Sequence, residues 1–135
     1  MVRTAGQIVL GAFLLFTGTA HLTFARLEFQ AQVPSWVPLD ENFVVIASGV
    51  VELCLALALL VTWRQPARAF VGVVTALFFV AILPGNIAQF TEHRDGFGLD
   101  TDAARAIRLL FQPLLVVWAL VVTGAVPYLR RRVGR

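Results

Sequence analysis

The fold of this chain is decided by residues 43–63, FVVIASGVVELCLALALLVTW, in which Glu52 is the one charged side chain. A helix needs about 20 mostly apolar residues to cross the hydrocarbon layer of a bilayer. Because lipid offers no partners for backbone amides, a spanning segment must satisfy them within itself, as a helix does. The segment therefore predicts a transmembrane helix.

Three further apolar segments, residues 5–22, 69–90 and 106–126, are also long enough to span a bilayer. Hydrophobic residues make up 59% of the 135 residues, more than a soluble core of this size could bury. The short connection at 64–68 forces its two spans into an antiparallel hairpin. We keep residues 5–22 as a span because the run is long for the core of a cleaved signal. The sequence thus predicts one all-α domain over residues 1–135, a four-transmembrane-helix antiparallel bundle.

Arginine placement predicts the orientation of this bundle. The tails and the connection between spans two and three carry no acidic residue and seven arginines: Arg3, Arg64, Arg68, Arg130, Arg131, Arg132 and Arg135. The positive-inside rule then places both termini in the cytoplasm, as expected of a multi-pass protein of the bacterial cytoplasmic membrane. Basic residues beside apolar spans, rather than along a soluble face, also argue against nucleic-acid binding.

The first outer loop, residues 24–42, mixes apolar and polar residues and contains Pro34-Ser35-Trp36-Val37-Pro38. We expect an interfacial or re-entrant cap with Trp36 at headgroup depth. Asp40 and Asp102 each precede a span closely enough to cap its first turn.

Polar side chains inside the spans are costly in lipid, so they are the first candidates for function. They fall at helical spacing, with Ser48 and Glu52, Asn86 and Gln89, and Arg108 and Gln112 each sharing one helix face. Pro84 and Pro113 should kink their helices in the same outer half. We therefore predict one outward-opening polar chamber above inner halves that are almost wholly apolar. The candidate ligand-binding or proton-handling residues are His21, Trp36, Ser48, Glu52, Asn86, Gln89, Arg108 and Gln112.

Structural roles compete with this interpretation. Glu52 could be a neutral acid hydrogen-bonded to Ser48 or to a neighbouring helix, and His21 could anchor a span end at the interface. Arg108 could snorkel to the surface rather than pair with Glu52. Asn86 and Gln112 could satisfy carbonyls freed by the nearby prolines.

Small residues within the spans predict where helices approach one another closely. Gly11 and Gly18 lie on the first span, and Gly72 and Ala76 lie on the third. We expect close helix crossings at both pairs, with a role in packing rather than chemistry.

Enzyme signatures are absent from the sequence. The single cysteine, Cys54, allows neither an intrachain disulfide nor a C-x-x-C pair. We find no phosphate-binding loop, nucleophile elbow or metal-ligand cluster, and no intrinsic cofactor is expected. The chain is at most a subunit of a redox complex rather than a self-contained enzyme.

The order of short motifs along the chain resembles the DoxX-like family of small bacterial membrane proteins. The motifs are Gly18-Thr19-Ala20-His21, Pro34-Ser35-Trp36-Val37-Pro38, Ser48-Gly49-Val50-Val51-Glu52, Pro84-Gly85-Asn86, and Arg108 followed by Gln112-Pro113 and Trp118. The resemblance implies four membrane helices and a link to quinone-linked redox chemistry, including thiosulfate:quinone oxidoreductases and oxidative-stress complexes. It also implies a distant similarity to eukaryotic receptor-assembly chaperones.

These inferences predict three functions from different classes. The first is an accessory subunit of a membrane oxidoreductase system that binds a quinone, a lipid or another small ligand and has a redox-protein partner. The alternative is a non-enzymatic, chaperone-like binding or assembly protein. The third is a small transporter formed as a homo-oligomer, because a single four-helix bundle leaves little room for alternating access.

Overall fold

A computed structural model describes residues 2–23, 30, 33–92 and 101–134, and within these ranges every regular element is a helix. The described helices are α1 (Val2–Leu22), α3 (Glu41–Val61), α4 (Ala67–Ala81), α5 (Leu83–Thr91), α6 (Asp102–Val122) and α7 (Ala125–Val133). In this part of the chain, four stretches are long and apolar enough to cross a membrane: Val2–Leu22, Glu41–Val61, Ala67–Thr91 and Ala103–Val122. The expected all-α fold with four candidate spans is confirmed.

The ends of the helices follow local chemistry. Asp40 caps α3 as predicted, because its Oδ1 accepts a hydrogen bond of 2.8 Å from the backbone amide of Asn42. The cap of α6 is Thr101, whose hydroxyl oxygen accepts a hydrogen bond from the amide of Ala104. The prediction of Asp102 as the cap is therefore wrong, because Asp102 is the first residue of the helix. At its other end α6 stops at Val122 rather than at residue 126, because Gly124 turns the chain with a φ of 70° that only glycine adopts readily.

The two prolines in the spans act differently. Pro84 has no amide hydrogen to donate to the carbonyl of Val80, and the third span is broken at Ile82 into α4 and α5. Pro113 lies inside α6, which continues past it. The kink predicted at Pro84 coincides with this break, whereas α6 is not interrupted at Pro113.

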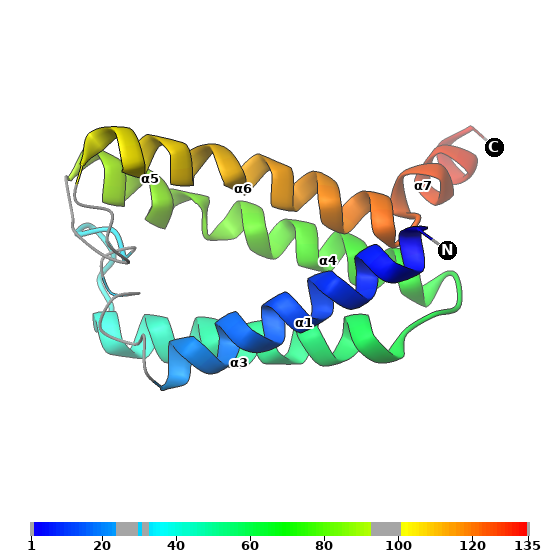
Figure 1. Cartoon of the computed structure of the whole chain (residues 1–135), viewed down its shortest axis with the longest axis horizontal. Helices are drawn as coiled ribbons and strands as arrows, with labels where there is room; N and C mark the ends of the chain where they lie inside the picture. Colours follow the sequence, from blue (N-terminus) through cyan, green and yellow to red (C-terminus); the bar gives the residue numbers. More distant parts are fainter. Residues whose placement is uncertain (1, 24–29, 31–32, 93–100, 135) are drawn as a thin grey trace.

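The long helices associate as two pairs, α1 with α3 and α4 with α6, and consecutive long helices run in alternating directions (Figure 1). Gly18 and Gly49 form the crossing of the first pair: a Cβ built on Gly49 would lie 2.7 Å from His21 Cβ and 3.2 Å from the carbonyl oxygen of Gly18. Gly11 packs on Leu60 and Ala56 in the same way, so the crossing predicted from Gly11 and Gly18 is confirmed. A Cβ on Gly72 would overlap Thr123 after α6, which confirms the predicted close approach of the third span as well.

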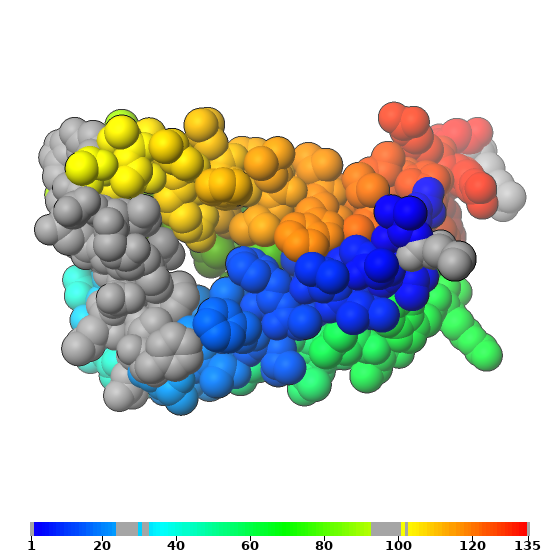
Figure 2. All heavy atoms as spheres, viewed as in Figure 1, coloured from blue at the N-terminus to red at the C-terminus, as the bar shows by residue number. Residues whose placement is uncertain are grey.

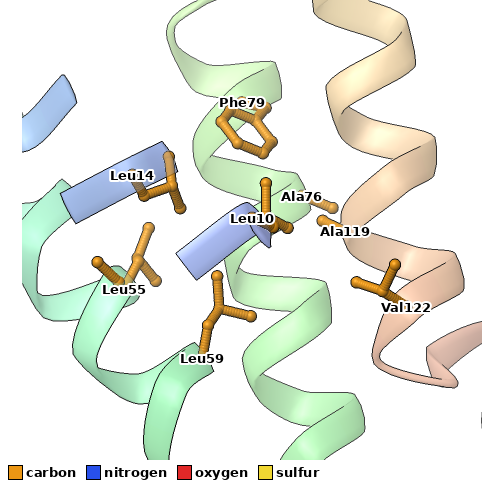
Figure 3. Packing of buried hydrophobic residues seen from close by; sticks show 9 residues of the cluster. Leu10, Leu14, Leu55, Leu59, Ala76, Phe79, Ala119 and Val122 are labelled. Atoms are coloured by element: carbon orange, nitrogen blue, oxygen red, sulfur yellow. The ribbon is translucent and has the colours of Figure 1, made fainter. Parts of the chain in front are cut away.

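A hydrophobic core joins the two helix pairs. Its buried members come from all four long helices, and those labelled in Figure 3 point toward one another. The members are Leu10, Leu14, Leu55, Ala56, Leu59, Ala76, Phe79, Ala119 and Val122. The core residues of α3 and α6 belong to the last two turns of those helices, so the core extends toward the end of the molecule that carries both termini, which we call the terminal end (Figure 1). At the opposite end, which we call the loop end, α1 and α6 lie apart.

The terminal end also contains a buried polar network that the sequence prediction missed. Gln7 is fully buried, and its Nε2 donates to the carbonyl oxygens of Leu59 at 2.7 Å and Thr62 at 2.9 Å. Its Oε1 accepts from Nε of Arg68 at 2.7 Å, and Nη2 of Arg68 donates to the carbonyl of Val122 at 2.9 Å. The prediction of almost wholly apolar inner halves is therefore wrong here, because these side chains complete backbone groups at the ends of α3 and α6.

Candidate ligand-binding site

A cavity of about 260 Å³ separates the two helix pairs at the loop end. Phe79, the last core residue of α4, lines it, and so does the described part of the first connection with Val33, Pro34, Trp36 and Val37. Figure 2 shows a hollow between α1 in blue and α6 in yellow to orange, with green atoms of the α4 segment behind it. Six of the eight predicted site residues line the cavity: His21, Trp36, Ser48, Glu52, Arg108 and Gln112.

One wall of the cavity is a cluster around Glu52, which is 5% exposed. The Thr17 hydroxyl donates a hydrogen bond to Oε1 of Glu52 from the neighbouring helix. Nδ1 of His21 lies 3.0 Å from Oε2 of Glu52 and 2.8 Å from the carbonyl oxygen of Thr17. A carbonyl oxygen only accepts, so the hydrogen of a neutral His21 is assigned to Nδ1.

The glycine crossing explains why these groups meet. Gly49 precedes Glu52 by one helical turn, and its lack of a Cβ lets the backbone of Gly18 approach within packing distance. That approach brings Thr17 and His21, which flank Gly18 on α1, against Glu52 on α3. Glu52 thus pairs with a neighbouring helix rather than with Ser48, and His21 is more than an interfacial anchor.

The opposite wall carries a positive charge. Nη1 of Arg108 donates to Oε1 of Gln112 at 3.4 Å, and Nε2 of Gln112 donates to the carbonyl oxygen of Phe79 at 2.7 Å. Phe79 lies in the last turn of α4, where carbonyl oxygens lack a helical hydrogen-bond donor. Gln112 therefore satisfies a carbonyl oxygen of the facing helix α4 rather than one of its own helix α6. Among the described residues, Arg108 makes no direct ion pair. The expected contact between Arg108 and Glu52 is replaced by the pair of Glu52 with His21.

Asn86 and Gln89 do not join this site. Both are buried, at 3% and 2% exposure, on α5, and neither lines the cavity. Nδ2 of Asn86 donates to the carbonyl of Ile82 at 3.5 Å, which matches the alternative role of satisfying backbone near Pro84. These two residues share a face with each other, but that face is not the one directed into the cavity.

Trp36 is 71% exposed and lies in the connection at the mouth of the cavity. Its neighbours at 24–29 and 31–32, part of the loop predicted to form a cap, lie outside the described residues.

Sequence reasoning missed Thr17, which contacts Glu52 directly. A signal was available, because Phe13, Thr17 and His21 recur every four residues on α1 and all line the cavity. Within the described ranges, no group of three His, Cys, Asp or Glu side chains could hold a metal ion.

Comparison with known proteins gives a family. A family model described as a domain of unknown function (DUF8561) matches residues 10–123, a stretch that includes every described residue lining the cavity. No curated protein and no solved structure matches the chain.

Proposed function

We propose that this chain, which belongs to the family described as a domain of unknown function (DUF8561), binds the headgroup of a quinone in the cavity that the matched segment lines. In this proposal it acts as an accessory subunit of a membrane oxidoreductase system. The observation that carries the proposal is the pairing of Glu52 with His21 on one wall while Arg108 faces the cavity from the other. The resemblance of the motif order to DoxX-like proteins supports the choice of a quinone.

The proposal includes a membrane arrangement. The four long helices cross the bacterial cytoplasmic membrane as an antiparallel bundle with the terminal end in the cytoplasm, and the loop end faces outward. Seven arginines without acidic residues in the tails and the connection at 64–68 support this orientation. Labelling a single cysteine placed at residue 4 or residue 39 in a Cys54→Ala background with a membrane-impermeant maleimide tests it: residue 39 should react in intact cells, and residue 4 only after permeabilisation.

The size and lining of the cavity suit an amphipathic ligand. Sites that enclose a whole drug-sized ligand measure about 300 to 1,000 Å³, so about 260 Å³ fits a ring-sized headgroup whose tail lies outside. Phe13, Val45 and Leu115 supply apolar surface, and Arg108 supplies hydrogen-bond donors for a carbonyl oxygen. The two polar walls would therefore orient a flat headgroup between them.

The residues also fit the proton balance of quinone chemistry. Reduction of a quinone to a quinol consumes two electrons and two protons. Glu52 and His21 are groups that can hold or release a proton beside the ring, as intramembrane carboxylates and histidines do in proton pathways. The chain itself contributes binding and proton handling, and a redox-protein partner would supply the electrons.

Binding of a short-tailed quinone tests the proposal. Purified protein in nanodiscs should carry quinone in its lipid extract, and decylubiquinone should quench the fluorescence of Trp36 in a Trp63→Phe, Trp118→Phe background. Replacing Arg108 with Leu should raise the Kd about tenfold, the effect of losing one charged hydrogen bond. The matched control is Ile107→Ala on the lipid-facing side of the same helix, which should leave the Kd unchanged.

Absence of quinone from the extract together with no saturable quenching would overturn the proposal. If Glu52→Gln instead supported quinone reduction by the redox partner as fast as the parent does, the carboxylate would have no part in the reaction. The non-enzymatic binding or assembly role would then be the better account.

A further inference from the structure

A second recess lies at the terminal end, between the start of α4 and α7, and we call it the α4–α7 groove. It measures about 550 Å³ and is lined by Pro66, Ala67, Ala69, Phe70, Val73, Tyr128 and Leu129. Apart from the Tyr128 hydroxyl, these side chains offer only apolar surface. The groove is separate in position and in character from the polar cavity at the loop end.

Specific contacts hold the groove open. The left-handed turn at Gly124 ends α6 and directs α7 back against α4. Gln65 fixes this turn, because its Nε2 donates to the carbonyl of Thr123 at 2.9 Å while its Oε1 accepts from the amide of Ala69 at 2.8 Å. The groove is therefore bounded by two helices that are fastened together at their near ends.

The rim of the groove is basic. Arg132 lies over the ring of Tyr128, with its guanidinium carbon 5.6 Å from the ring centre, and its Nε donates to the Tyr128 hydroxyl at 3.2 Å. Arg130 and Arg131 lie beside it on α7. The sequence has no Asp or Glu after residue 102 and none between residues 53 and 91, so no nearby carboxylate in the sequence neutralises these arginines.

We propose that the α4–α7 groove binds one anionic phospholipid, with an acyl chain against Phe70, Val73 and Leu129 and the phosphate at Arg132. Phe70 is 69% exposed on α4, at the end of a helix apolar enough to span a bilayer, so the groove faces the place where lipid would lie. A basic pocket beside apolar helix surface at a membrane boundary has the chemistry that anionic headgroups recognise. The charge complementarity favours an anionic lipid over a neutral one.

This proposal rests only on the four helices crossing a bilayer. It depends neither on which face of the membrane the terminal end occupies nor on the quinone site. Measuring the quinone content of each variant below therefore distinguishes a failure of the lipid proposal from a failure of the proposed quinone function.

Native mass spectrometry of the full chain with added lipid tests the proposal. Dioleoyl phosphatidylglycerol should form a one-to-one adduct about fivefold more than dioleoyl phosphatidylcholine does, because one arginine near an anionic headgroup contributes about that factor. Val73→Trp fills the groove and should remove the preferred adduct. Leu77→Trp, one turn further along α4 and outside the groove, should leave it unchanged.

A second pair of variants tests the headgroup contact. Arg132→Gln should bring the two lipids to equal binding, whereas Arg131→Gln, which removes the same charge from the same helix, should retain most of the preference. Because Arg131 and Arg132 are both exposed, neither change should prevent folding.

Three results would overturn the proposal. The parent protein could bind both lipids equally, or Val73→Trp could keep the preferred adduct. In the third, Val73→Trp would convert a dimer to a monomer while lipid binding stayed as before, which would identify the groove as a contact between two copies of the chain.

Discussion

The contact between His21 and Glu52 should be measurable as a coupling energy between α1 and α3. Nδ1 and Oε2 are 3.0 Å apart, and the two side chains are 13% and 6% exposed. Full charges at this distance would attract by about 5.5 kcal/mol at an effective dielectric constant of 20, but desolvation offsets most of that gain. Polar pairs inside membrane proteins typically measure about 0.6 kcal/mol and reach about 1.7 kcal/mol.

We expect a coupling of about 1 kcal/mol for His21 and Glu52, within that measured range. The burial of the pair and its fixed position beside the glycine crossing favour a value above the average. The hydrogen on Nδ1 of His21 is shared between Glu52 and the carbonyl oxygen of Thr17. Because His21 keeps its bond to Thr17 when the carboxylate is removed, we do not expect the coupling energy to reach the top of the measured range.

A double-mutant cycle in mixed micelles provides the assay. The parent, His21→Leu, Glu52→Leu and the double variant are unfolded with increasing SDS, and helix loss is followed by circular dichroism. His21→Leu combined with Thr123→Val is the control, because Thr123 lies at the terminal end and its hydroxyl bonds within its own helix to Ala119. Distant sites add to within about 0.3 to 0.5 kcal/mol, so a His21–Glu52 coupling no larger than the control value would refute this account of the contact.

Three further outcomes follow from other contacts. Gly49→Ala should destabilise the protein by about 1 to 3 kcal/mol in the same SDS titration, because the new Cβ would lie 2.7 Å from His21 Cβ; an unchanged midpoint would contradict it. Arg68→Gln should lower the free energy of unfolding by about 1 to 3 kcal/mol by leaving Gln7 Oε1 without its donor, and retention of full stability would show that the network contributes little. Pro84→Ala restores the missing amide at the break and should make the helix more continuous there, which would move the cavity wall at Ile82 and Pro84. Decylubiquinone should then bind several-fold more weakly, and unaltered quenching would show that binding does not depend on the break.

The helices were predictable because lipid imposes strict conditions on a spanning segment. Residues 43–63 could be assigned from length and composition, and α3 covers Glu41–Val61. The end of the last span was less predictable, since the apolar run continues to residue 126 while Gly124 already turns the chain. Hydropathy records where a segment is apolar, whereas the helix end depends on one backbone conformation.

The candidate site was predictable as far as helix faces are concerned. Spacing placed Ser48 with Glu52, and Arg108 with Gln112, on faces that do line one cavity. The partner of Glu52 could not be found in this way, because it depends on the relative position of α1 and α3, which the approach of Gly18 to Gly49 sets. Spacing along one helix carries no information about that offset.

The polar network at the terminal end was hidden for a related reason. Gln7 has no polar neighbour at helical spacing within the predicted span of residues 5–22, and Arg68 already had an explanation as a charge that orients the protein. Their contact appears only when α1 and the start of α4 meet. An arginine counted as a topological signal can thus also take part in hydrogen bonds that join helices.

The arrangement of hydrogen bonds at the loop end indicates how a ligand could be accommodated without loss of the fold. Thr17, His21 and Glu52 bond across α1 and α3, whereas Arg108, Gln112 and Phe79 bond across α6 and α4. Each wall therefore completes these bonds within its own helix pair, and the two pairs are joined instead by the core and the Gln7 network at the terminal end. A headgroup that reached from Arg108 to the Glu52 cluster would add contacts between the pairs without displacing the contacts that hold them together.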